Sequence, residues 1–165
     1  MPAIRARRPA RRLTSIKPAP YRHLLVATDG SARARRAAAA AVALAAALGA
    51  RLSSLYVVPE GVPTAFSGAK LYASPVLAPQ YRRALQAAAD QALGAVARAA
   101  GAAGVRHSML RATARAPWQA IVHSAKAHKC DLIVLATRGA RGWRMLGSQT
   151  VKAIAHTRIP VLVLR

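Results

Sequence analysis

The fold is decided by residues 23–31, which read His-Leu-Leu-Val-Ala-Thr-Asp-Gly-Ser. An apolar run without polar alternation is typical of a short strand that is buried on both faces. Asp29 and the glycine after it predict a turn, and Ser31 is a residue type that caps the N-terminus of a helix. We therefore expect a strand over residues 23–28, followed by a helix that begins after Ser31 and ends at Gly49.

The remainder of the chain repeats this pattern of short apolar runs and longer helical stretches. Residues 131–136 form the strongest further strand, because Leu-Ile-Val-Leu contains no polar residue. Strands that alternate with helices predict parallel βαβ units, and right-handed crossovers arrange five such strands as a doubly wound α/β sheet with helices on both faces. The other expected strands are 52–58, 105–110 and 159–164, and the other expected helices are 78–100, 118–128 and 148–156.

The composition narrows the class of protein. A chain of 165 residues is long enough for one ordinary domain with a substantial core. Cys130 is the single cysteine, which excludes a disulfide framework or a cysteine-cluster metal site within one chain. The longest apolar run, residues 37–48, is shorter than the ~18–20 residues that span a bilayer, and no apolar signal core lies near the N-terminus. We therefore expect a cytoplasmic protein without a membrane span.

The charge is strongly unbalanced, because the chain has 26 Lys and Arg residues but only 4 Asp and Glu residues, which gives a net charge of +22. Such a charge is self-repelling, so bound anions should stabilise the folded state, unless the arginines are simply a solvated surface. Residues 1–20 are rich in Arg and Pro and contain no acid, which predicts a flexible basic arm ahead of a domain over residues 21–165. The arm could contact nucleic acid or another polyanion, or could be an inert extension or an organelle leader.

Candidate binding residues cluster where the expected strands end, which is where open parallel sheets bind ligands. Asp29 follows the first strand, where a carboxylate can accept hydrogen bonds from a ribose hydroxyl or an adenine amino group; alternatively, it forms an Asx turn. Residues 137–148 contain three glycines and end in Gly147 and Ser148, which begin a helix whose first N–H groups favour a phosphate. This segment contains neither a P-loop lysine nor a dinucleotide-type glycine motif.

Three arginines, Arg33, Arg35 and Arg36, lie in the opening turns of the first helix. Cations there oppose the helix dipole, and a bound polyanion nearby would offset that repulsion; solvated arginines are the alternative. Groups suited to catalysis are poorly represented: no pair of acids suggests acid–base chemistry, and no Gly-x-Ser-x-Gly motif occurs. His123 and His128 are five residues apart and do not share a helix face as a metal pair would. The sequence therefore predicts a protein that is not an enzyme and has no metal site.

Taken together, these segments resemble the universal stress protein family over residues 21–165. The resemblance rests on a set of short motifs in a fixed order, each weak when taken alone. They are Leu-Leu-Val-Ala-Thr-Asp-Gly-Ser (24–31), Leu-Tyr-Val-Val (55–58), Ala-Pro-Trp-Gln-Ala-Ile (116–121), Cys-Asp-Leu-Ile-Val-Leu-Ala-Thr-Arg-Gly (130–139), Gly-Ser (147–148) and Arg-Ile-Pro-Val-Leu-Val-Leu (158–164).

The resemblance implies a parallel sheet of order 3-2-1-4-5, a homodimer and, in one branch of the family, ATP held at the strand ends. Adenosine would lie against the first strand end and the main chain of Val57, and the phosphates against Gly139, Gly147 and Ser148. With their neighbours, the candidate nucleotide-binding residues are Ala27, Thr28, Asp29, Val57, Ala136, Arg138, Gly139, Gly147, Ser148 and Gln149.

One departure from the ATP-binding pattern concerns the phosphate loop. That branch has Gly-x2-Gly-x9-Gly-Ser/Thr, whereas this chain has Ala136 at the first position and only seven residues between Gly139 and Gly147. The ligand expected from the resemblance is ATP or another adenine nucleotide, with or without Mg²⁺, and a smaller nucleotide or an empty site remains open.

The last expected strand supplies a reason to dimerise, since residues 159–164 are apolar and lie at a sheet edge in this order. The sequence therefore predicts a cytoplasmic, homodimeric, adenine-nucleotide-binding protein of stress response and signalling. The alternatives are a basic protein that associates with nucleic acid through its arm, or a dimeric scaffold that binds no nucleotide.

Overall fold

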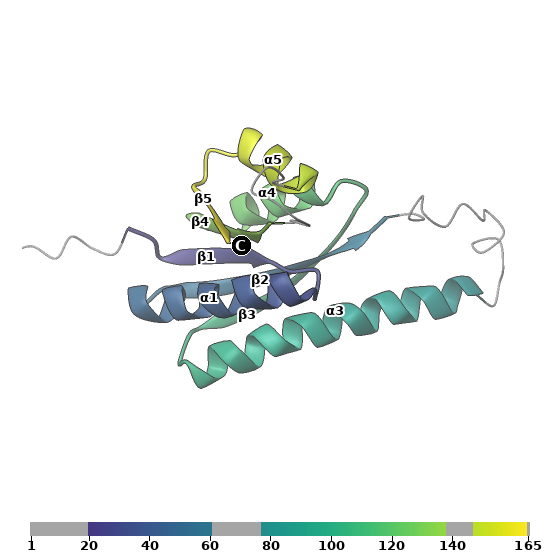
Figure 1. The fold of residues 1–165 in the computed structure, drawn as a ribbon, viewed down its shortest axis with the longest axis horizontal. Helices are drawn as coiled ribbons and strands as arrows, with labels where there is room; N and C mark the ends of the chain where they lie inside the picture. The colour runs from purple at the N-terminus through teal and green to yellow at the C-terminus, as the bar shows by residue number, and fades with distance from the viewer. Residues whose placement is uncertain (1–19, 61–76, 138–146, 165) are drawn as a thin grey trace, which may run out of the picture.

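A five-stranded parallel sheet lies at the centre of the computed structural model, which describes residues 20–60, 77–137 and 147–164 (Figure 1). Its strand order is β3-β2-β1-β4-β5, which confirms the expected fold class. The strands are β1 (His23–Ala27), β2 (Arg51–Pro59), β3 (His107–Ala114), β4 (Leu132–Ala136) and β5 (Val161–Leu164). The expected basic arm, apart from its last residue, lies outside the described residues, as do residues 61–76 and 138–146.

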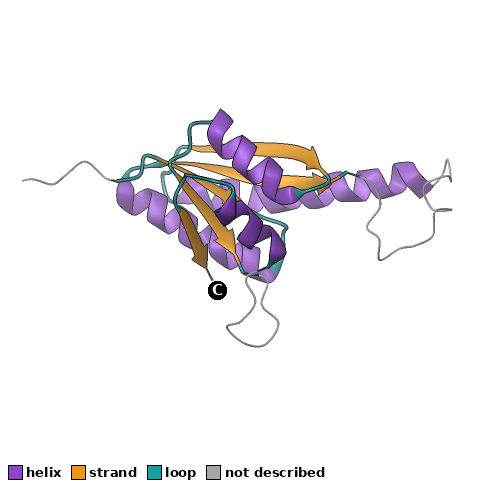
Figure 2. Ribbon diagram, turned by 90° about the horizontal axis from the view of Figure 1, so that it is seen from above, coloured by secondary structure: helices purple, strands orange, loops and turns teal. Residues whose placement is uncertain are grey.

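Helices cover both faces of this sheet, as the sequence predicts (Figures 1 and 2). Because successive strand residues point to opposite faces, Leu24 packs in one core cluster while Leu25 packs in another. The first cluster includes side chains of α1 and α3, and the second includes side chains of α4 and α5. The helices are α1 (Ala32–Leu48), α3 (Leu77–Ala102), α4 (Pro117–Ala127) and α5 (Ser148–Ala155).

Alanines make the contact between α1 and the sheet. Ala38, Ala41 and Ala45 are buried and cluster with Leu24 of β1 and Val134 of β4. Their small side chains let the helix axis approach the strands closely. Packing therefore explains the buried alanines of this segment, whereas Ala39, Ala40, Ala43, Ala46 and Ala47 are exposed.

Local signals fix both ends of α1 where the sequence places them. The Ser31 hydroxyl accepts a hydrogen bond from the Ala34 N–H at 3.2 Å, which satisfies one of the amide groups that lack an intrahelical partner. Gly49 has a φ of 62°, the left-handed conformation that ends helices and that glycine adopts without steric cost.

The structure corrects the expected limits of two edge strands. β3 begins at His107 and continues to Ala114, four residues past the expected end, and pairs with β2 as far as Pro59. From Met109 onward alternate residues of β3 are exposed, so Arg111 fits its outer face without ending the strand. β5 begins only at Val161. A bilayer-crossing helix is absent from the described residues, since each helix there is too short or too polar to traverse one.

A row of polar side chains crosses the amino end of the sheet on the α4 side. His23 Nε2 lies 2.8 Å from Ser53 Oγ, which lies 2.7 Å from Ser108 Oγ. The other ring nitrogen of His23 lies 3.6 Å from Cys130 Sγ. Burial lowers the pKa of His23 and raises the pKa of the Cys130 thiol to about 11, so both groups are neutral at physiological pH.

Candidate functional site

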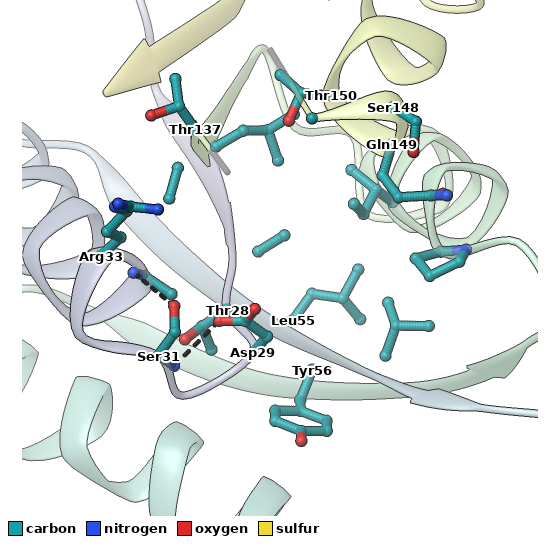
Figure 3. Close-up of a pocket in the computed structure, with 18 of the residues that line it drawn as sticks. Thr28, Asp29, Ser31, Arg33, Leu55, Tyr56, Thr137, Ser148, Gln149 and Thr150 are labelled. Atoms are coloured by element: carbon teal, nitrogen blue, oxygen red, sulfur yellow. Dashed lines mark hydrogen bonds between the residues drawn. The ribbon is translucent and has the colours of Figure 1, made fainter. Parts of the chain in front are cut away.

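A cavity of about 740 Å³ opens at the carboxyl ends of β1, β2 and β4 (Figure 3). This volume is in the range of small-molecule pockets, roughly 300–1,000 Å³. The cavity lies where the strand order reverses, because β1 pairs with β2 on one side and with β4 on the other. It therefore occupies the position at which open α/β sheets bind ligands.

Most of the candidate residues named from the sequence line this cavity. Arg138 and Gly139 lie outside the described residues. Those that the structure brings together are Ala27, Thr28, Asp29, Val57, Ala136, Gly147, Ser148 and Gln149.

The turn between β1 and α1 forms one wall and is held by short-range hydrogen bonds. Asp29 Oδ1 accepts from the Ser31 N–H at 3.0 Å (Figure 3). Thr28 Oγ1 accepts from the Gly30 N–H at 3.2 Å. Gly30 has a φ of 76°, a conformation that favours glycine. The Asx turn anticipated for Asp29 is thus present, and it fixes the carboxylate at the edge of the cavity.

The N-terminus of α5 forms the facing wall. Its cap residue, Gly147, has no side chain to bond the first N–H groups, and Ser148, Gln149 and Thr150 follow it along the cavity (Figure 3). The first amides of a helix have no intrahelical acceptor and carry the positive end of its dipole. This wall can therefore bind an anion.

The Gln149 side chain has a structural task that the sequence did not reveal. α4 begins with Ala116 as its cap residue and Pro117 at its first position, so no side chain at the cap bonds its amides. Gln149 Oε1 accepts from the Trp118 N–H instead, at 3.2 Å. This bond joins the N-termini of α4 and α5 and engages the side-chain oxygen of Gln149.

Sequence reasoning missed Tyr56 and Leu85. Tyr56 is only 8% exposed, lines the cavity and packs against Leu93 of α3. Burial first, and then the nearby Asp29 carboxylate, raise the pKa of its phenol, so Tyr56 is neutral at physiological pH. Tyr56 precedes Val57 in an expected strand and could have been found by position. Leu85 could not, because its approach depends on how α3 packs across the sheet.

Arg33 and Arg36 of α1 also line the cavity, whereas Arg35 does not. The Arg35 guanidinium donates to the Gly30 carbonyl at 2.7 Å. Figure 3 shows Arg33 on the side of the cavity next to Thr137, across from Ser148 and Gln149. The sequence left these arginines as either a polyanion contact or a solvated surface and did not place them at the site.

The described part of the cavity combines an apolar floor, one carboxylate, several hydroxyl groups, two arginines and a helix N-terminus. Such a lining suits a ligand with a flat apolar ring, hydroxyl groups and an anionic end. In the described ranges, no three His, Cys, Asp or Glu residues are grouped as a metal site would require.

The chain belongs to the universal stress protein family, because the sequence model of that family matches residues 20–165. It is 38% identical over 148 residues to the universal stress protein in the QAH/OAS sulfhydrylase 3′ region of Thermus aquaticus, an alignment that covers 88% of this chain and 99% of that protein.

Solved structures of the same family share the fold. Universal stress protein UspA from Lactobacillus plantarum is 30% identical with a TM-score of 0.68, over 89% of this chain and 99% of that one. A universal stress protein crystallised in complex with cAMP is 26% identical with a TM-score of 0.62, over 88% of this chain and 98% of that one.

Proposed function

We propose that the cavity binds an adenine nucleotide and that the protein acts in stress response and signalling through this binding. The observation that carries the proposal is the convergence of three features on one cavity: the Asp29 carboxylate, the end of β2 at Val57, and the N-terminus of α5. The cAMP complex of a similar universal stress protein supports an adenine nucleotide as the ligand class.

Each feature matches one part of the nucleotide. The half-buried Val57 and the buried Leu55 provide an apolar floor for the base. Asp29 is fixed by the Ser31 amide in a position to accept hydrogen bonds from ribose hydroxyls. The N–H groups that follow Gly147 would hold a phosphate.

ATP, with or without Mg²⁺, is the nucleotide implied by one branch of the family. Ala136 and the seven residues between Gly139 and Gly147 depart from that branch, so ADP, AMP and cAMP belong in the same test. Binding without catalysis fits a cavity in which the described residues contribute one carboxylate and no partner acid.

Isothermal titration of the purified chain with ATP, ADP, AMP and cAMP tests the site. We expect micromolar binding of at least one nucleotide by the wild type and at least tenfold weaker binding by Asp29→Ala. Asp90→Ala is the matched control, because it removes an exposed carboxylate that pairs with Arg111 away from the cavity. Absence of heat with the wild type at millimolar nucleotide rejects the proposal.

A cytoplasmic homodimer that pairs through residues 159–164 is part of the same proposal. β5 is an edge strand whose residues are all half-buried, and an apolar edge favours pairing with another copy. Val163 belongs to neither core cluster of the described residues, so Val163→Lys would disturb an edge contact more than the core. Light scattering should show a dimer for the wild type and a monomer for this variant.

The net charge of +22 favours a second candidate, association with nucleic acid or another polyanion through residues 1–20. Binding to mixed-sequence DNA should then fall steeply with salt and weaken when residues 1–20 are removed. Equal weak binding by both forms would exclude a role for the arm. If nucleotide and DNA both fail to bind, a dimeric scaffold is the remaining function.

A further inference from the structure

The wall that α1 contributes to the cavity is cationic. Arg33 and Arg36 lie three residues apart, the spacing that places side chains next to each other on one helix face, and both line the cavity. Arg35, on a different face, bonds the Gly30 carbonyl instead. Two of the three arginines in the first turns of α1 therefore line the cavity.

The helix α1 itself does not compensate the positive charge of these two arginines. The first turn of α1 contains no acidic residue, and the positive end of the helix dipole lies there as well. Between described residues, no ion pair involves Arg33 or Arg36. An anion in the cavity would relieve this repulsion.

Arg33 lies across the cavity from the other anion-binding feature, the N-terminus of α5 (Figure 3). Figure 3 shows Arg33 beside Thr137, with Ser148 and Gln149 of α5 on the far side. A phosphate chain between these walls would meet guanidinium groups on one side and main-chain amides on the other. Arginine binds phosphate oxygens in a bidentate manner and is always charged.

We propose, on the basis of the proposed nucleotide site, that Arg33 and Arg36 select the ligand by the charge of its phosphates and take the neutralising role that a divalent cation commonly has. Mg²⁺ binds nucleotides through phosphates and one or two protein carboxylates. The described lining supplies a single carboxylate, Asp29, which accepts from the Ser31 amide and which the proposed function assigns to the ribose hydroxyls rather than to a metal. Two guanidinium groups next to the phosphates would also repel a dication. The site therefore binds metal-free nucleotide, with affinity that increases from AMP to ATP.

Titrations of the full chain with adenosine, AMP and ATP, in EDTA and in Mg²⁺, test this. We expect the wild type to bind ATP at least tenfold more tightly than AMP in EDTA. Arg33→Gln/Arg36→Gln should lose this preference while its affinity for adenosine, which has no phosphate, is unchanged. Arg33→Lys/Arg36→Lys should retain part of the preference, because it keeps the charge and loses the bidentate geometry.

The matched control is Arg98→Gln/Arg106→Gln, which removes two exposed arginines remote from the cavity lining and should keep the wild-type preference. Two results overturn the inference alone: nucleotide binding with an unchanged ATP-to-AMP ratio in the cavity variant, or wild-type binding of ATP that requires Mg²⁺. Failure of the wild type to bind adenosine, AMP and ATP in both buffers overturns the proposed function as well.

Discussion

His23 is a titratable side chain at the amino end of the central strand β1, in hydrogen-bond contact with Ser53 and close to the Cys130 thiol. Burial, and then the charge of Arg51, lower its pKa below 6.5, against smaller opposing effects that include the Asp131 carboxylate. His107, on the other face of the sheet, bonds Ser54 Oγ at 2.9 Å, and burial lowers its pKa as well.

These two shifts predict an acid-sensitive fold. Each histidine has a lower pKa in the folded than in the unfolded chain, so its contribution to stability is complete above about pH 6.5 and is lost as the pH falls below that value. Urea titrations should show a free energy of unfolding that declines from pH 7 to pH 5. His23→Gln/His107→Gln should be less stable at pH 7 but show a shallower decline.

The exposed His123 of α4 provides the control. His123→Gln should reproduce the wild-type profile. A double variant with the full wild-type decline would show that the acid sensitivity has another origin.

At the scale of the element, two glycines should respond oppositely to alanine. Gly49 adopts a φ of 62°, so although an added Cβ would meet nothing within 4 Å, Gly49→Ala should destabilise by about 1 kcal/mol. Gly94 lies inside α3, where an added Cβ would meet only the Arg98 guanidinium at 3.5 Å, an ordinary contact. Gly94→Ala should stabilise by roughly 0.5–1 kcal/mol.

Urea denaturation of both variants measures these effects at equal ionic strength. Circular dichroism of the folded proteins checks that neither helix is lost. A shift of the same sign in both variants would contradict the conformational account of these positions.

The elements that could be predicted from the sequence are those whose local and packing signals agree. β1 and α1 combine an unbroken apolar run with the Ser31 cap and the Gly49 stop, and all of these are present in the structure. The two sides of the site formed by β1 and α5 could also be predicted, because Asp29 follows an apolar run and Gly147 and Ser148 begin a helix. β3 was predicted too short because, at a sheet edge, exposed residues such as Arg111 interrupt the apolar pattern without interrupting the strand.

The parts of the site that could not be predicted depend on tertiary packing. Leu85 reaches the cavity from a helix whose crossing over the sheet has no sequence signal. Which of these arginines face the cavity, Arg33 and Arg36 rather than Arg35, depends on the exact rotation of α1 against the strands. The task of Gln149 became visible only once α4 and α5 were placed side by side.

At the scale of the whole molecule, Cys130 should report on global opening. It is the single cysteine of the chain, is 5% exposed and has a thiol pKa of about 11. Both burial and protonation suppress attack on a thiol reagent, since the thiolate is the nucleophile. Labelling with a chromogenic disulfide at pH 8 should therefore be slow for the native protein and rapid in urea. Immediate, complete labelling without urea would disprove the buried position.

Ligand binding should also be visible as stability. A ligand that binds only the folded state adds about 2.7 kcal/mol at a hundredfold excess over its Kd. Thermal denaturation should therefore show a higher Tm with the nucleotide that binds most tightly, and a smaller increase for Asp29→Ala at the same nucleotide concentration. An equal increase in both proteins would indicate a general effect of anions on a chain of net charge +22.

The walls of the cavity come from both helical layers: α1 and α3 from one face of the sheet, and α4 and α5 from the other. Elsewhere the strands separate these two helical layers. A molecule bound in the cavity would therefore contact both layers directly, whereas elsewhere they are connected only through the sheet. Amide hydrogen exchange should then slow together at the first turns of α1 and α5 when the cavity fills. Two helices more than a hundred residues apart in the chain would fluctuate as one cooperative unit.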